Sequence, residues 1–408
     1  MLTARGWSVL AGSFLLWGAS RLVGSADLHV LAVGLVGLVA LAATFVRVGG
    51  PRLQVSRRLS TRRAFPGTRV RVDLELESAG PTVTPFVVLE DRLPAAFGGS
   101  ARAVVAAVHP RRRRSVTYQV TARSRGRYEL GPATAAVADP FDLVRRRVTL
   151  PDRHELVVYP EVEDLPGDGV AAPAGSSGES SSRHLFRTGE EFYTMRPYET
   201  GDDLRRIHWP STARTGELMI RQDETARRAT AVVLLDTRAE AVGARPQMFE
   251  RAVSAAASVG TLYLRLGYSL RLATPDLSPS AVAHEHFLET LALVEPSDRE
   301  VLTPTLRRVR PLAARIPSLI VVTHVPVAAE LAVLIRSGAL FASRTAVLVT
   351  DADPARLAPA EREAFDRRLA AARTSFRRGG WEVVLVRPGQ RLREVWRSSP
   401  RRRIAASS

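Results

Sequence analysis

Two long apolar stretches open the chain. Residues 7–23 are apolar apart from Arg21 and a few small polar residues, and residues 28–46 contain no Asp, Glu or Arg. Each stretch has about the 20 residues that a helix needs to cross a bilayer. The short link between them allows only an antiparallel turn, and a helical hairpin satisfies every backbone hydrogen-bonding group in lipid. The pattern therefore predicts two transmembrane helices within residues 1–50.

A signal peptide and a buried hairpin in a soluble core are the alternatives to a membrane anchor. A signal peptide would need a small-residue cleavage site and would leave the second stretch unexplained. A charge-free run as long as the second one is rarer in a soluble core. Basic flanks set the orientation by the positive-inside rule, which predicts that both termini and the soluble domains are cytoplasmic. These flanking residues are Arg5, Arg47, Arg52, Arg57 and Arg58, whereas the link carries Asp27.

The pattern changes after residue 50 to short runs with a period of two. Residues 70–76 and 116–120 alternate apolar with polar side chains, and residues 87–89 and 156–159 are further short apolar runs. Such alternation is typical of half-buried antiparallel strands. We therefore expect a β-sandwich-like domain over residues 51–160. Residues 161–187 are rich in Gly and Ser and predict a flexible linker or loop.

Residues 229–400 alternate apolar runs with helical stretches. The strand candidates are residues 231–235, 269–273, 318–323, 345–350 and 381–386, and the helix candidates are residues 248–266 and 361–378. Nearly continuous apolar strands separated by helices indicate a parallel sheet covered on both faces. Ligands and partners of such sheets bind at the carboxyl ends of the strands. The fold class is thus multidomain, with a Rossmann-like α/β domain at its carboxyl side.

Composition excludes several kinds of chemistry. The net charge is +17, but all 58 basic residues are Arg, a bias typical of GC-rich genomes, so nucleic acid is kept only as a minor alternative partner. Without Lys the chain has no Walker A lysine and no Schiff-base enzyme, and without Cys it has no thiolate metal site. The basic runs 111–114 and 145–147 are interpreted as solvated turns or strand edges, with contact to acidic lipid headgroups as the alternative. Residues 401–408 form a basic tail.

Residues 188–228 hold the most distinctive motif, spelled FYTMRPYETGDDLRRIHWPSTARTGELMIRQDE from residue 192 to residue 224. Its spaced residues include Arg196, Tyr198, Gly201, Asp202, Asp203, Arg206, His208, Trp209 and Arg214. Residues 126–132 (GRYELGP) and 139–141 (DPF) lie upstream. Together these motifs resemble the bacterial domain-of-unknown-function family 58. In that family, Asp often stands at the place of His208 and Ser at the place of Thr212.

The signature segment has three physical interpretations. Gly201 before two carboxylates predicts a tight turn in which Asp202 or Asp203 caps the next turn, with Trp209 packed beneath. A rigid, charge-paired loop is the first interpretation. A partner-binding surface is the second, because Trp and Arg are typical interface anchors. A nucleophilic triad of Asp203, His208 and Ser211 is the third, but proximity in sequence is poor support for triad geometry.

The carboxy-terminal domain resembles the von Willebrand factor A fold. That fold binds metal through Asp-x-Ser-x-Ser after its first strand, whereas this chain has Asp236, Arg238 and Glu240. Because a cation at a ligand position repels Mg²⁺, we interpret the metal site as degenerate and expect no metal and no cofactor. His324 stands where the fold usually has Asp.

The resemblance also implies a function, since members are thought to work beside MoxR-type AAA+ ATPases. The leading hypothesis is a membrane-anchored, non-enzymatic adaptor or assembly factor that contacts lipid, such an ATPase and client proteins. A membrane-bound hydrolase using the His208 region and a cell-envelope structural protein are the alternatives.

Overall fold

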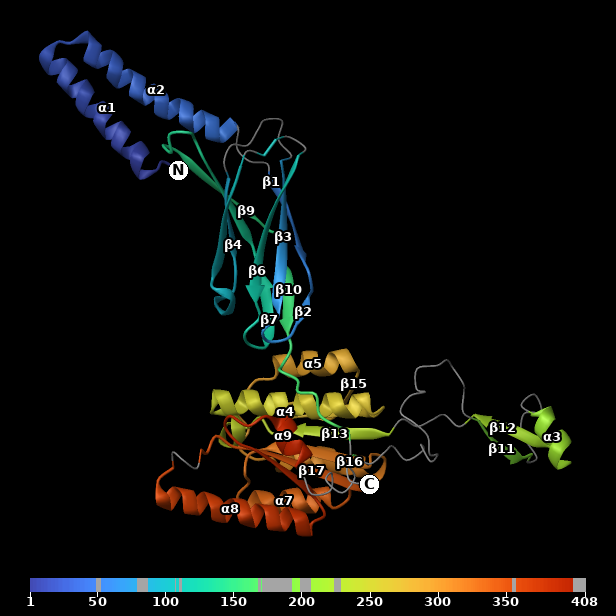
Figure 1. The fold of residues 1–408 in the computed structure, drawn as a ribbon. Coiled ribbons are helices and arrows are strands. Elements are labelled where there is room, and N and C mark those ends of the chain that lie inside the picture. The colour runs from blue at the N-terminus through green and yellow to red at the C-terminus, as the bar shows by residue number, and fades with distance from the viewer. Residues whose placement is uncertain are drawn as a thin grey trace. The chain divides into compact units, whose positions relative to one another are not determined.

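The computed structural model describes residues 1–48, 53–78, 87–106, 108–109, 112–167, 170, 193–198, 207–223, 229–353 and 357–398. The chain divides into two compact units (Figure 1). Unit 1 is Met1–Glu161 with Leu288–Val294, and unit 2 is Val162–Phe287 with Glu295–Ser408. The protein is therefore multidomain.

Unit 1 begins with two antiparallel helices, α1 (Ala4–Val23) and α2 (Ala26–Val48). The Thr3 hydroxyl caps α1 by accepting a hydrogen bond from the Gly6 amide at 3.1 Å. Ser13 is buried between the helices, and its hydroxyl donates to the Ala32 carbonyl at 2.7 Å. Within the described residues, one helix is long and apolar enough to cross a membrane, over Ala26–Arg47 with a mean hydropathy of 2.3. A membrane-spanning role for α1 stays a prediction.

The described residues of unit 1 also contain ten strands, in three sheets that share one apolar core. The first sheet has the order β1 (Leu53–Leu59), β3 (Arg69–Ser78), β6 (Arg113–Thr121). The second is β2 (Arg63–Ala64), β10 (His154–Val158), β7 (Gly126–Leu130), and the third is β5 (Ser100–Val105), β4 (Val87–Arg92), β8 (Ala133–Ala138), β9 (Arg145–Leu150). Every pairing is antiparallel except that of β2 with β10. The alternation in residues 70–76 is confirmed, since Val70, Val72, Leu74 and Leu76 are all buried.

A buried ion pair joins two of these sheets. The guanidinium of Arg57 donates to the Asp91 carboxylate at 2.6 Å, and neither side chain is more than 1% exposed. The Tyr118 hydroxyl donates to the other oxygen of Asp91. Arg57, one of the basic residues that follow the predicted membrane helices, is thus paired and buried in the folded core.

The GRYELGP motif explains how the core admits that guanidinium. Gly131 has a φ of +101°, and a Cβ there would lie 2.5 Å from Nη1 of Arg57 and 2.6 Å from the Asp152 carbonyl oxygen. Only glycine adopts this backbone conformation at low cost and leaves the space free. The motif is therefore a structural requirement of unit 1.

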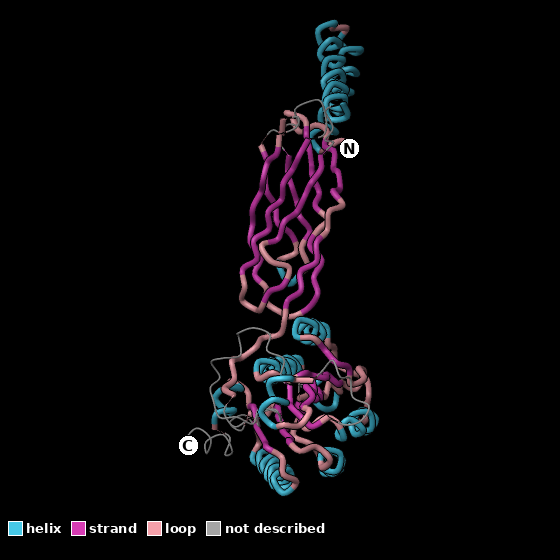
Figure 2. Tube along the Cα trace, turned by 90° about the vertical axis from the view of Figure 1, so that its right-hand side faces the viewer, coloured by secondary structure: helices cyan, strands magenta, loops and turns pink. Residues whose placement is uncertain are grey.

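Unit 2 is built on a six-stranded sheet of order β15 (Ser280–Val282), β14 (Ser269–Ala273), β13 (Thr230–Leu235), β16 (Ser318–Thr323), β17 (Ser343–Val349), β18 (Glu382–Val386). All pairings are parallel except that of β15 with β14. Helix α4 (Pro246–Arg265) covers one face, and α7 (Ala328–Gly338) and α8 (Pro359–Arg378) cover the other (Figure 1). Figure 2 shows helices on both sides of these strands. Helices α6 (Thr303–Val309) and α9 (Leu392–Arg397) also belong to unit 2, whereas α5 (His284–Leu293) is divided between the two units. The predicted strands and helices of this region are thus present.

Candidate functional site

The carboxyl end of β13 carries an ion pair formed inside the fold. Arg238 donates from Nε to one oxygen of Asp236 and from Nη2 to the other, each at 2.8 Å. Both residues are buried, with 2% and 0% of their surface exposed. The parallel geometry is that of the strong two-pronged pair between guanidinium and carboxylate. The guanidinium of Arg238 thus binds both oxygens of Asp236, the carboxylate predicted to follow this strand.

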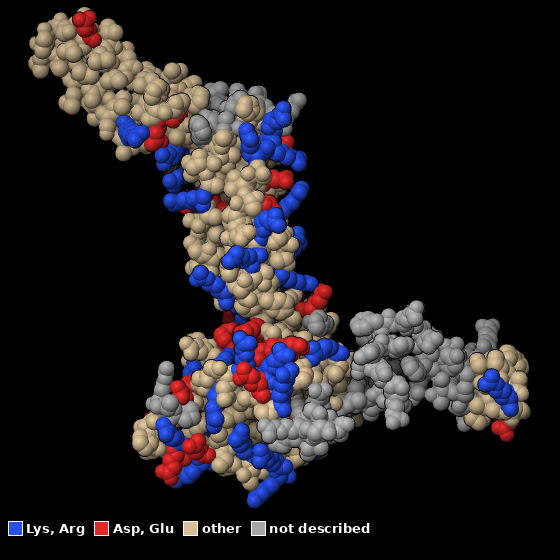
Figure 3. Space-filling model, in the orientation of Figure 1, with Lys and Arg blue, Asp and Glu red and all other residues tan. Residues whose placement is uncertain are grey.

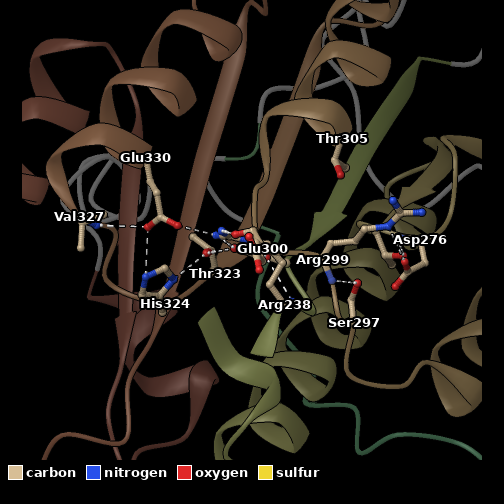
Figure 4. A network of polar contacts seen from close by, with 12 residues as sticks. Arg238, Asp276, Ser297, Arg299, Glu300, Thr305, Thr323, His324, Val327 and Glu330 are labelled. Carbon is tan, nitrogen blue, oxygen red and sulfur yellow. Dashed lines mark hydrogen bonds and ion pairs between the residues drawn. The ribbon is translucent and has the colours of Figure 1, made fainter. Parts of the chain in front are cut away.

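Residues from neighbouring elements complete the network (Figure 4). The Thr323 hydroxyl, at the end of β16, donates to Asp236 at 2.7 Å. Nη2 of Arg238 also donates to Glu330 in α7 at 2.7 Å, and Nη1 donates to the Glu300 carbonyl at 2.9 Å. His324 lies 3.2 Å from the second oxygen of Glu330. The network therefore ties strands β13 and β16 to the first turn of α7.

The network shifts the pKa values of its charged groups. Burial raises the pKa of Glu330, but hydrogen bonds from His324 and Arg238 and their charges outweigh it and lower that pKa to about 2. Burial lowers the pKa of Arg238, but its bonds to Asp236 and Glu330 outweigh that effect and raise the pKa above its usual value. Both groups therefore stay charged over the physiological range.

A cleft of about 1400 Å³ opens at the same edge of the sheet. Its apolar floor includes Met248, Val325, Val349 and Phe365. Among the described residues that line it, the carboxylates are Glu240, Glu250, Glu330, Asp351, Asp353 and Glu361, and they outnumber the three arginines Arg245, Arg251 and Arg368. Because the protein as a whole carries a charge of +17, this acidic lining distinguishes the cleft from the rest of the surface. It lies where parallel α/β sheets bind ligands and partners.

The three residues predicted to form a degenerate metal site do not lie in one cluster. Asp236 and Arg238 form the buried pair, whereas Glu240 is exposed and lines the cleft. Within the described residues, no group of three or more His, Asp or Glu side chains is placed to hold a metal ion. Arg238 occupies both oxygens of Asp236. The burial of Arg238 could not be seen in the sequence.

The signature segment forms more regular structure than the expected loop. Strand β11 (Tyr193–Pro197) pairs antiparallel with β12 (Met219–Asp223), and helix α3 (Trp209–Thr215) lies between them in sequence. His208 caps α3, since its Nδ1 accepts from the Ser211 amide at 3.3 Å and lies 2.9 Å from the Ser211 hydroxyl. The Thr212 hydroxyl accepts from the Met219 amide at 3.0 Å, which joins α3 to β12.

The signature side chains are described only in part. Trp209 is 66% exposed, so the expectation that it packs beneath charged residues is wrong. Arg214 is exposed too, and the Tyr198 amide donates to the Leu218 carbonyl at 2.8 Å. Arg196 belongs to β11, but its side chain is outside the described part of the chain, as are Gly201, Asp202, Asp203 and Arg206 in full. Of the three triad candidates, the described residues bring together His208 and Ser211.

Comparison with known proteins finds a family model that matches a region including most of the signature segment. The family described as "Protein of unknown function DUF58" matches residues 194–360. The uncharacterized protein YeaD of Bacillus subtilis is 24% identical over 363 residues, which are 86% of this chain and 87% of that protein. Solved structures align weakly. The CARDB domain of a Pyrococcus furiosus protein shows 17% identity over 26% of this chain and 88% of its own, and a cohesin module from Clostridium perfringens shows 14% identity over 26% and 97%, with TM-scores of 0.20 and 0.21. These two likenesses carry no argument about function.

Proposed function

We propose that this protein is a membrane-anchored adaptor or assembly factor without catalytic activity of its own, and that it acts with a MoxR-type AAA+ ATPase on client proteins. In this proposal α1 and α2 both cross the cell membrane, and both soluble units lie in the cytoplasm. Unit 2 is a von Willebrand factor A-like domain whose strand-end cleft binds protein instead of metal.

The pair of Arg238 with Asp236 is the observation that carries the proposal. A strand-end carboxylate that served as a metal ligand or a general base would need a free oxygen. Here both oxygens are bound by one guanidinium, and the Thr323 hydroxyl adds a third hydrogen bond. The chemical group at the centre of the edge is thus neutralised, while the described residues of the surrounding cleft include more carboxylates than arginines. Such a surface favours a partner with exposed basic side chains.

Two further observations support an adaptor. Trp209 is exposed on α3, and large exposed aromatic side chains beside arginine are typical anchors of protein interfaces. The helical hairpin exposes many large apolar side chains, which a bilayer would cover. These include Trp7, Phe14, Leu15, Leu22, Val30 and Leu41.

The experiment is a pull-down of the full-length protein, in mild detergent, with a MoxR-type ATPase from the same organism. Trp209→Ala and Glu240→Arg are expected to weaken ATPase binding by at least about tenfold, because the first removes an anchor and the second places a like charge against a basic partner. Val301→Ala and Asp298→Arg are the matched controls, since both residues are exposed in unit 2 and lie outside the cleft. Equal binding by all four variants would contradict the proposal.

The membrane-bound hydrolase is kept as a second candidate because Nδ1 of His208 lies 2.9 Å from the Ser211 hydroxyl. The same contact caps α3, so it has a structural role without catalysis. Ser211→Ala keeps an amide for the cap and removes only the hydroxyl. Full cellular function in Ser211→Ala would exclude a serine nucleophile at this position, whereas loss of function with ATPase binding intact would favour the hydrolase. A reporter fused to the carboxyl terminus tests the cell-envelope alternative, which needs the soluble units outside.

A further inference from the structure

The turn between β8 and β9 is rigid and carries an exposed aromatic residue at its tip. Asp139 is 4% exposed, and its carboxylate accepts from the Phe141 amide at 2.9 Å and from the Val144 amide at 2.6 Å. Asp142 has a φ of +54°, which closes the turn in the left-handed region. Phe141 is 59% exposed. The DPF motif therefore fixes the backbone of a turn that projects a phenyl ring outward.

This turn is seated on the helical hairpin. Leu2 forms an antiparallel bridge with Val144, and the Thr3 amide donates to the Leu143 carbonyl at 2.9 Å. A Cβ on Gly6 would lie 2.3 Å from that carbonyl oxygen, so α1 approaches the turn as closely as backbone permits. Leu143 and Val144 are buried in a cluster with Val39, Ala42 and Val46 of α2.

The contacts with α2 set the depth of the turn. The membrane-compatible part of α2 ends at Arg47, and Val39 lies eight residues earlier. At 1.5 Å per residue, Val39 is about 12 Å from the end of the span along the helix axis. Leu143 and Val144 pack against this last part of the span. If α2 crosses the bilayer, the turn lies in the boundary between headgroups and hydrocarbon.

Basic residues surround the turn on the strands that lead to it. A groove of about 550 Å³ runs over the third sheet, with a floor of Thr134, Ala136 and Ala138 and with Arg102, Arg145 and Arg147 along it. Arg145 pairs with Asp142 and Arg102 with Glu90. Arg147 is exposed and makes no ion pair within the described part of unit 1. Figure 3 shows basic side chains over the end of the strand-rich region beside the helices, while the helices themselves are almost free of charge.

We propose that the β8–β9 turn is a second membrane contact, in which Phe141 inserts between lipids and Arg145 and Arg147 bind the phosphates of anionic phospholipids in the same leaflet. This inference rests on the membrane anchor of the proposed function. An exposed apolar ring flanked by arginines is the composition that prefers the bilayer interface. The small floor of the groove leaves room for a headgroup beside the two guanidiniums, which bind phosphate well.

The test uses the full-length chain, which has no cysteine and so accepts a single introduced one. Phe141→Cys carries an environment-sensitive dye, and Glu155→Cys is the matched control because 53% of its side chain is exposed at strand β10. Both proteins are placed in vesicles of phosphatidylcholine with phosphatidylglycerol. We expect the dye at residue 141 to be shielded from acrylamide in water and quenched by brominated lipid, and the dye at residue 155 to show the opposite behaviour.

Flotation of the vesicles separates failure of the turn from failure of the anchor. If the chain floats with the lipid but both dyes are equally open to acrylamide, the inference about the turn is overturned and the anchor stands. If the chain does not float, the anchor fails and the inference falls with it. Shielding at residue 141 without quenching by brominated lipid would mean that protein covers the turn, which also overturns the inference.

A second set of variants tests the arginines. In the Phe141→Cys background, the double substitution Arg145→Gln with Arg147→Gln is expected to lower the ratio of lipid-inserted to water-exposed dye. The decrease should be about fivefold per arginine in anionic vesicles and much smaller in phosphatidylcholine alone. The matched control is Arg127→Gln with Arg153→Gln, a pair of exposed arginines on strand β7 and just before β10. Equal shielding in both kinds of vesicle, unchanged by the first pair of substitutions, would refute binding of lipid phosphate by these arginines.

Discussion

Arg238 binds both carboxylate oxygens of Asp236, two residues before it in the sequence, and the pair is almost entirely removed from solvent. The strand-end position of an α/β sheet, where a ligand usually binds, is thus filled by the protein's own side chain. Four expected outcomes follow from this pair and from the other contacts described above.

Replacing Arg238 by Met should destabilise unit 2 by about 3–5 kcal/mol, because it leaves the buried charge of Asp236 without its partner. Arg299→Met is the matched control, since Arg299 pairs with Asp276 at 3.4 Å while both side chains are more than half exposed. The control should cost less than about 1 kcal/mol. Denaturant unfolding followed by the fluorescence of the buried Trp381 and Trp396 measures both effects. Equal costs would show that the buried pair contributes nothing beyond a surface pair.

Millimolar Mg²⁺ and a chelator should both leave the unfolding midpoint of unit 2 unchanged. A metal that bound the folded state would stabilise it in proportion to its occupancy. The oxygens of Asp236 are held by Arg238 and Thr323, so no free carboxylate remains at that position. A rise of the midpoint with Mg²⁺ would contradict the interpretation of a degenerate metal site.

Glu330→Gln should destabilise the protein by about 2 kcal/mol at neutral pH, because it removes a charged acceptor from Arg238 and His324. The folded pKa of Glu330, about 2, is below its ordinary value of 4.5. Its contribution is therefore complete above pH 4.5 and is lost as the pH falls toward 2. Unfolding of the wild type and the variant, measured over this pH range, should converge at the acidic end. A constant difference between them would refute the assigned charge.

Gly131→Ala should destabilise unit 1 by about 3 kcal/mol or more, since the new methyl group meets the Arg57 guanidinium and the Asp152 carbonyl. Gly98→Ala is the matched control. Gly98 has a similar φ of +97°, but a Cβ there would have no neighbour within 4 Å. The control carries only the backbone strain, about 1 kcal/mol. Thermal unfolding of the two variants separates steric collision from strain, and equal losses would mean that the contact with Arg57 is unimportant.

Local patterns in the sequence predicted the longest helices, α1, α2, α4 and α8, and most strands of the unit 2 sheet. The strand candidates 269–273 and 318–323 coincide with β14 and β16, because each is a short apolar run between clear breaks. Strands β11 and β12 were missed. They are five residues long, carry charged residues and owe their pairing to partners about 25 residues apart, which no local period reports.

The site was harder to predict because its contacts are distant in sequence. Arg238 contacts Glu330 across 92 residues, and Arg57 contacts Asp91 across 34. Arginines are usually exposed to solvent, so each one in a sequence is predicted to be exposed. Only the tertiary structure shows which arginines pair with a buried carboxylate. The DPF and GRYELGP motifs were identified as family features, but their roles in shaping a turn and in admitting Arg57 required the structure.

The packing of the helical hairpin against the β8–β9 turn also has a consequence for the order in which these segments form during synthesis. The hairpin ends at Val48 and Leu143 follows 95 residues later, so at about 5 to 20 residues per second the hairpin is translated roughly 5 to 19 seconds before its seat. Helices α1 and α2 therefore lack their contacts with the strands during that interval. If the hairpin spans a membrane, as proposed, it inserts before the strand-rich region is complete, and that region then packs against helices that are already in place.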